Sequence, residues 1–145
     1  MKHLARALLF VLLGVAAGSV GAEDAGAYRV IVHPSNPTSQ LTRLKLGEMF
    51  LKKAPRWPDG HPVAAVEPSS RAATRQRFTQ EVFGKSTVAV SAYWQQMIFS
   101  GKGIPPPEKA NDAEILAFVR DTPGAIGYVA SGADLSGVKV MAIVD

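Results

Sequence analysis

The sequence predicts a single α/β domain, layered like three-layer folds, with a mostly parallel sheet. The chain has 145 residues, of which 47% are hydrophobic, so it is long enough to bury the core of one domain. From residue 28 onward, short β-branched runs alternate with segments of helical periodicity. This order is typical of parallel strands joined by crossover helices. Cysteine is absent, which excludes disulfide-stapled miniproteins, thiolate metal sites and cysteine nucleophiles.

The first 22 residues have the pattern of a secretory signal peptide. Lys2 and Arg6 give a positively charged start, residues 7–17 are almost entirely apolar, and small residues lie at 20–22, as a signal peptidase requires. The apolar stretch is shorter than the roughly 20 residues of a membrane-spanning helix. We therefore expect export to the periplasm, a domain over residues 23–145 and no stable membrane insertion after cleavage. The alternative is a retained membrane anchor.

The charge of the exported part is small. Without residues 1–22 the chain keeps 14 Lys and Arg against 12 Asp and Glu, a net charge of +2. A surface this weakly basic gives little attraction for nucleic acid. We expect no nucleic-acid partner.

The strands and helices are predicted from local patterns. The clearest strand, residues 28–32, is a β-branched run that stops at His33-Pro34. The polar stretch 35–40 is predicted as a loop. Three further strands are predicted at 62–66, 125–129 and 138–144. Helices are predicted from residue 42, over 70–83, over 87–99, and from residue 111 to the break at 122–124.

Two of these helices begin at recognisable caps. Thr42 is a suitable N-cap, and Leu41 before it is placed to pack on Leu46. Asn111 is a second N-cap, with Glu114 three residues later in a position similar to a capping box. Both positions favour helix starts at these residues.

Two loops are candidate ligand sites, because ligands of layered α/β domains bind where strand carboxyl ends meet helix amino ends. They are residues 34–36 and 68–71. In the second loop, Ser69 and Ser70 lie at the predicted helix start, where free N–H groups and the helix dipole favour an anion. Arg71 and Arg75 follow on one face, where they repel each other and oppose the dipole. Such a conflict indicates a compensating negative charge, either a bound anion or a neighbouring acid.

A purely structural interpretation of these residues stays open. Either serine can be a simple cap, and the arginines can be solvated or paired with acids such as Glu67 and Glu81. Ser35 and Asn36 are also residue types that commonly form a turn.

Other polar and aromatic side chains give no sign of catalysis. His33 and His61 lack further ligands at metal spacing, so no metal site is expected. No nucleophile–base arrangement or carboxylate pair is evident, so we expect neither an enzyme nor a cofactor. Trp57, Tyr93 and Trp94 are expected to pack in the core.

A series of motifs resembles the phosphate-binding component of bacterial ABC transporters, a type II periplasmic binding protein family. Together they cover residues 28–144. The family has two lobes that close on phosphate, and this chain is long enough for one, so the resemblance implies a single lobe. The motifs are Val30-Ile-Val-His-Pro-Ser-Asn-Pro, Leu41-Thr with Gly47-Glu-Met-Phe-Leu, Trp57-Pro-Asp-Gly, Phe78, and Phe118-Val-Arg-Asp-Thr-Pro-Gly-Ala-Ile-Gly-Tyr-Val.

The chain departs from the family at the phosphate loop, an Arg-Ser-x-Gly-Ser-Gly-Thr pattern before a helix. Counted back from Phe78, the threonine of the pattern falls on Thr74 and its first serine on Ser69. Pro68 stands where the pattern has its arginine, and alanines stand at the later serine and glycine. Arg71 is a neighbouring residue that would supply the lost charge.

We therefore expect an exported, non-enzymatic protein that binds phosphate or a related oxyanion for transport or sensing. The alternative is a periplasmic interaction module that has lost ligand binding. The expected partners are an ABC permease or a sensor ectodomain, and a second copy of the chain that would complete the cleft. The candidate ligand-binding residues are Ser35, Asn36, Ser69, Ser70, Arg71, Thr74 and Arg75.

Overall fold

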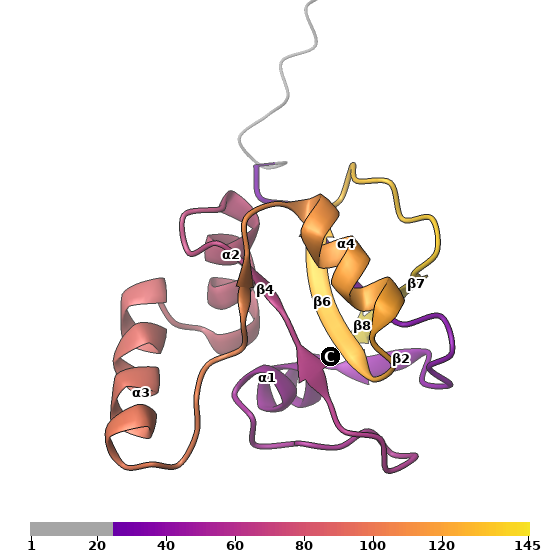
Figure 1. The fold of residues 1–145 in the computed structure, drawn as a ribbon. Helices are drawn as coiled ribbons and strands as arrows, with labels where there is room; N and C mark the ends of the chain where they lie inside the picture. The colour runs from indigo at the N-terminus through magenta and orange to yellow at the C-terminus, as the bar shows by residue number, and fades with distance from the viewer. Residues whose placement is uncertain (1–24) are drawn as a thin grey trace, which may run out of the picture.

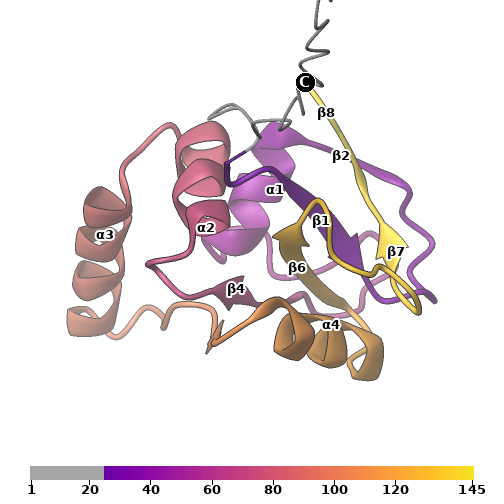
Figure 2. The same ribbon diagram turned by 90° about the horizontal axis from the view of Figure 1, so that it is seen from above.

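Strands β1 (Tyr28–Val32) and β6 (Ala125–Ala130) are the inner strands of a four-stranded sheet in the order β3-β6-β1-β7. Figure 1 shows β6, and Figure 2 shows β1 beside it. The computed structural model describes residues 25–145. The signal peptide expected at residues 1–22 lies outside this range. The predicted α/β class is confirmed, since helices pack on both faces of this sheet.

The sheet is mixed, which corrects the expectation of a mostly parallel sheet. β3 (Ala64–Ala65) is parallel to β6, but β1 runs antiparallel to both of its neighbours, β6 and β7 (Lys139–Val140). Burial of a strand can be predicted from its own residues. Its direction depends on partners about 100 residues away in sequence, which local patterns do not report.

Two short parallel pairs lie outside the main sheet. One joins β2 (Gln40–Thr42) to β8 (Ala142–Val144), and the other joins β4 (Glu67–Pro68) to β5 (Glu108–Lys109). The strand predicted at 138–144 is therefore two strands in different sheets.

The helices lie close to where the sequence places them. The predicted N-caps are confirmed: Thr42 Oγ1 accepts a hydrogen bond from the Lys45 N–H at 3.1 Å, and Asn111 Oδ1 accepts one from the Glu114 N–H at 3.0 Å. The helix predicted from residue 70 begins three residues later and ends as a π-helix. The helices are α1 (Arg43–Phe50), α2 (Ala73–Phe78), the π-helix η2 (Thr79–Phe83), α3 (Thr87–Phe99) and α4 (Asp112–Asp121). Within residues 25–145, none of these is long and apolar enough to cross a bilayer.

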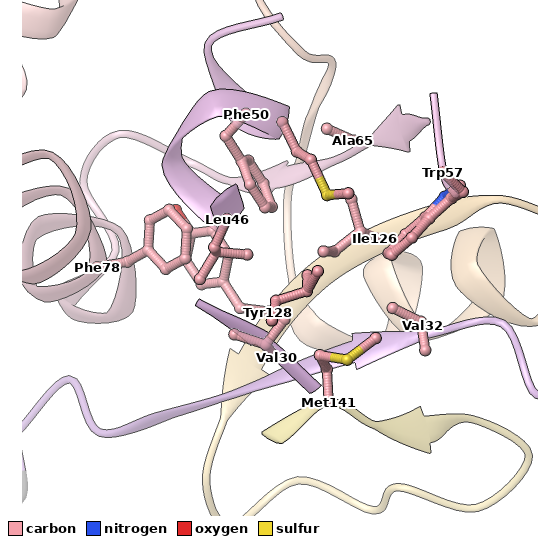
Figure 3. Packing of buried hydrophobic residues seen from close by; sticks show 12 residues of the cluster. Val30, Val32, Leu46, Phe50, Trp57, Ala65, Phe78, Ile126, Tyr128 and Met141 are labelled. Atoms are coloured by element: carbon pink, nitrogen blue, oxygen red, sulfur yellow. The ribbon is translucent and has the colours of Figure 1, made fainter. Parts of the chain in front are cut away.

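The core has two parts, one on each face of the sheet (Figure 2). Along β1, Val30 and Val32 face the α1–α2 side, whereas Ile31 faces α4. On the α1–α2 side, Phe78 stacks on Tyr128 with ring centroids 3.9 Å apart (Figure 3). The result is a helix–sheet–helix arrangement in which helices cover both faces of the sheet.

The expected packing role of the tryptophans is confirmed. Trp57 is 3% exposed, and its Nε1–H donates to the Gly124 carbonyl at 2.8 Å. Trp94 is buried in α3, and Tyr93 beside it is half-buried.

Candidate functional site

The two candidate loops lie toward opposite ends of the sheet. Val32 is paired with Ile126 near the start of β6, so the chain after β1 continues toward Gly124. Ala65 is also opposite Ile126, but β3 is parallel to β6, so the chain after it continues toward Tyr128. The antiparallel direction of β1 therefore separates residues 34–36 from residues 68–71. The structure does not bring the predicted site residues together in one place.

The turn around Ser69 is held by the β4–β5 pair. The Ser69 N–H donates to the Lys109 carbonyl at 3.1 Å, and the Ser69 carbonyl accepts from the Ala72 N–H at 2.9 Å. The Ser69 hydroxyl accepts from the Arg71 N–H at 3.4 Å. Helix α2 begins at Ala73 after Ala72, which makes no side-chain capping bond. Neither serine is the helix cap.

The Arg75 side chain is buried in the protein interior. Its Nη1–H donates to the Pro68 carbonyl at 2.8 Å and to Glu108 Oε1 at 3.0 Å, and its Nη2 lies 3.0 Å from Glu67 Oε2. The side chain is 10% exposed, against 3% for Glu67. Arg75 therefore joins α2, β4 and β5, and acids supply the compensating negative charge expected near it.

Glu67 is the most buried charged residue of this cluster. Burial raises the pKa of Glu67, and the positive charge of Arg75 acts in the opposite direction. The Tyr128 hydroxyl donates to Glu67 Oε1 at 3.2 Å. Burial and the Glu67 carboxylate raise the pKa of Tyr128, so this hydroxyl keeps its proton and remains a donor. The cluster ties β4 to β6.

Arg71 has a different environment from Arg75. Arg71 and Ser70 are exposed at the turn, and Thr74 lies buried behind them in the first turn of α2. Among the residues described, the Arg71 guanidinium has no hydrogen bond or ion pair. Its donors are available to a ligand from solution.

One contact of this turn, made by the backbone of Lys109, was missed by the sequence analysis. The Lys109 carbonyl is bonded to Ser69, and its ammonium lies 5.5 Å from the centre of the Phe118 ring. Lys109 is 40 residues from Ser69 in sequence, and only the β4–β5 pairing brings the two together. No local sequence signal could have identified it.

Ser35 and Asn36 lie in a separate recess with Trp57, Asp59 and His61. Ser35 Oγ is 2.7 Å from His33 Nδ1. Asn36 is buried, and its Oδ1 accepts from the Thr38 N–H at 2.9 Å. These bonds match the turn interpretation of the two residues. In the part of the chain that is described, no group of three or more His, Asp or Glu side chains is placed to hold a metal ion.

The fold can be compared with solved structures. An ABC-type phosphate transport receptor from Vibrio cholerae matches with a TM-score of 0.64 and 18% identity, over 82% of this chain and 47% of that chain. A putative phosphate ABC transporter substrate-binding protein with bound phosphate from Clostridium perfringens matches with a TM-score of 0.62 and 20% identity, over 82% and 46%. A possible phosphate binding protein from Planctomyces limnophilus gives a TM-score of 0.59 at 20% identity.

This chain has the fold of part of a phosphate ABC transporter substrate-binding protein. It spans less than half the length of the first two structures it matches. Neither a protein-family model nor a curated protein sequence matches it. The resemblance seen in the sequence motifs is thus confirmed at the level of the fold.

Proposed function

We propose that this chain is an exported, periplasmic solute-binding protein that binds phosphate or a related oxyanion, for transport or sensing. The observation that carries the proposal is the exposed Arg71 guanidinium at the Ser69 turn, in a fold shared with phosphate transport receptors. No metal, cofactor or catalytic group is needed for such binding.

In this proposal Arg71 supplies the main charge. A guanidinium presents paired N–H donors that match two phosphate oxygens. The Ser69 and Ser70 hydroxyls are further donors beside it. Thr74 lies behind the turn, and Arg75 is a positioning residue that fixes the Pro68 carbonyl and the strand pair.

Ser35 and Asn36 have no direct role at this site within one molecule, because they lie toward the other end of the sheet. Ser35 and Asn36 would contact a ligand at the Ser69 turn only if they came from a second copy of the chain. The Ser69 turn is open to water on one side, so the attraction between charges is screened. We therefore expect modest affinity that weakens with salt.

Titration calorimetry with inorganic phosphate tests the site. Arg71→Ala removes an exposed charge pair worth about 1 kcal/mol, which is roughly a fivefold rise in Kd. Arg29→Ala removes an exposed arginine from β1 and is the matched control, expected to leave Kd unchanged. Equal affinity of Arg71→Ala and the unaltered protein would contradict the site, and no heat at millimolar phosphate would contradict the function.

A second candidate function is a periplasmic interaction module that docks an ABC permease or a sensor ectodomain. The observation that favours it is the pairing of Arg75 with Glu67 and Glu108, which removes one candidate phosphate donor. Neighbouring permease and ATPase genes would support transport, and a neighbouring receptor or kinase gene would support docking.

A further inference from the structure

A cavity of about 300 Å³ lies between α1, the π-helix η2 and α3. Gly47 and Val90 in its lining are buried, and Val82 and Phe83 of η2 are half-buried. The volume is at the lower end of the range for small-molecule sites, which are lined mostly by apolar side chains. None of its lining residues belongs to the Ser69 turn or to the recess around Ser35 and Asn36.

Helix α1 carries apolar residues on two sides. Leu46 and Phe50 are buried in the core beneath the helix. Leu44, Gly47 and Leu51 follow one another at intervals of three and four residues and line the cavity instead. Leu44 is 74% exposed. Because a surface helix normally has polar residues on the side away from the core, the second apolar side of α1 is suited to contact a ligand.

The wall of the cavity has two unusual backbone features. Glycine in the interior of a helix lowers stability relative to alanine, yet Gly47 lies within α1. A Cβ there would be 3.4 Å from Val82 Cγ1 and 3.6 Å from Phe83 Cδ1, so alanine would fit, and glycine leaves space that alanine would partly fill. Val82 and Phe83 belong to the π-helix, a rare conformation that is frequent at functional sites.

Tyr93 joins α3 to the end of α1 and borders the cavity. Its hydroxyl donates to the Leu51 carbonyl at 3.3 Å. The Lys53 ammonium lies 5.9 Å from the centre of the Tyr93 ring. This contact holds one cation beside the apolar lining.

The rim of the cavity has a positive charge that the protein does not neutralise. Lys53 and Lys85 both line the cavity and are exposed. Within residues 25–145, neither ammonium has an ion pair with an acid. Glu48 is the acid of the lining, and its Oε2 lies 3.3 Å from the ammonium of Lys45, which is outside the cavity. A ligand that complements this site is therefore apolar at one end and negatively charged at the other.

We propose that this cavity binds a small carboxylate with an apolar tail. The tail lies against Gly47, Val82 and Val90, where its burial supplies most of the binding free energy. The carboxylate faces Lys53 and Lys85, whose exposed charges add a smaller contribution. The proposal does not depend on phosphate binding at the Ser69 turn, because inorganic phosphate has no apolar part and the two sites share no residue.

Titration calorimetry with octanoate tests the charge of the ligand. We expect one equivalent to bind, and 1-octanol, which has the same chain without the charge, to bind more weakly. The double variant Lys53→Gln with Lys85→Gln is expected to raise the Kd of octanoate roughly tenfold. Lys102→Gln removes an exposed lysine outside the lining and is the matched control. No binding at millimolar octanoate, or equal Kd values for the double variant and the control, would overturn the proposal.

Gly47→Ala tests the position of the tail. The added methyl group favours the helix and narrows the cavity, so we expect several-fold weaker octanoate binding with an unchanged or higher Tm. Amide NMR is expected to show octanoate-dependent shifts at Gly47, Val82 and Val90. Shifts confined to the exposed Val88 and Phe99 of α3, an unchanged Kd in Gly47→Ala, or displacement of octanoate by inorganic phosphate would overturn the assignment. Failure of phosphate to bind at the Ser69 turn would leave all these results unchanged.

Discussion

Gly124 occupies a left-handed backbone conformation with φ of +82°, at the turn before β6. Its carbonyl accepts the hydrogen bond of the Trp57 indole. Three residues later, Gly127 lies beneath Val66, and Tyr128 stacks on Phe78. This motif, one of the series that resembles the transporter family, is thus used for packing and hydrogen bonds in the core. It indicates the fold more directly than the ligand.

Gly124→Ala is expected to destabilise the protein. Its Cβ would lie 2.3 Å from the Pro62 carbonyl oxygen, and the left-handed conformation alone costs a side chain about 1–3 kcal/mol. Urea unfolding measures the loss. Gly132→Ala is the control, because nothing lies within 4 Å of its Cβ position. Equal stabilities of the two variants would contradict this account of Gly124.

Arg75→Met is expected to cost about 3–5 kcal/mol, because it leaves the Glu67 carboxylate buried without its cation. The double variant Arg75→Met with Glu67→Gln removes that charge, so it is expected to recover much of the loss. Denaturant unfolding of both proteins measures the difference. Lys45→Met, which breaks the exposed pair with Glu48, is the control and is expected to change stability by less than about 1 kcal/mol. If Arg75→Met lowers the free energy of unfolding no more than this control does, the ion pair of Arg75 with Glu67 does not stabilise the interior.

At the scale of elements, the longer segments were predictable and the short ones were not. Strand β1 and helix α3 have the predicted bounds, because each carries a full repeat of its own pattern. β2, β4 and β5 contain two or three residues each, too few for any periodicity. Their formation depends on partners distant in sequence. The Ser69–Lys109 contact, which builds the candidate site, depends on such a pair.

The π-helix η2 is a second feature that the sequence pattern did not reveal. It continues α2 with a wider turn and includes Thr79, which is 1% exposed. Within residues 25–145, the Thr79 hydroxyl is the one buried side-chain polar atom without a hydrogen-bond partner.

Thr79→Val is expected to stabilise the protein by about 1 kcal/mol, because it keeps the shape and removes a buried hydroxyl with no partner. Thermal unfolding followed by circular dichroism measures the change in Tm. Thr79→Ser keeps the hydroxyl and loses a methyl group, so this control is expected to lower Tm. A lower Tm for Thr79→Val would indicate that the hydroxyl has a stabilising contact.

At the scale of the whole molecule, the direction of one strand decides which residues meet. A parallel β1 would have placed Ser35 and Asn36 beside Ser69, as the sequence analysis expected. The antiparallel β1 separates them, so one molecule presents only the Ser69 turn. The matched receptors are more than twice as long as the aligned part. A single open site is consistent with weak binding and with a role for a second copy.

The most direct test of the proposed site is a phosphate titration of the isotopically labelled protein, followed by amide NMR. We expect saturable shifts at Ser69, Ser70 and Arg71, with the recess around Ser35 and Asn36 unmoved. The Arg71→Ala protein is expected to show the same shifts only at several-fold higher phosphate. Saturable shifts confined to Ser35 and Asn36, or none at millimolar phosphate, would contradict the assignment of oxyanion binding to the Ser69 turn.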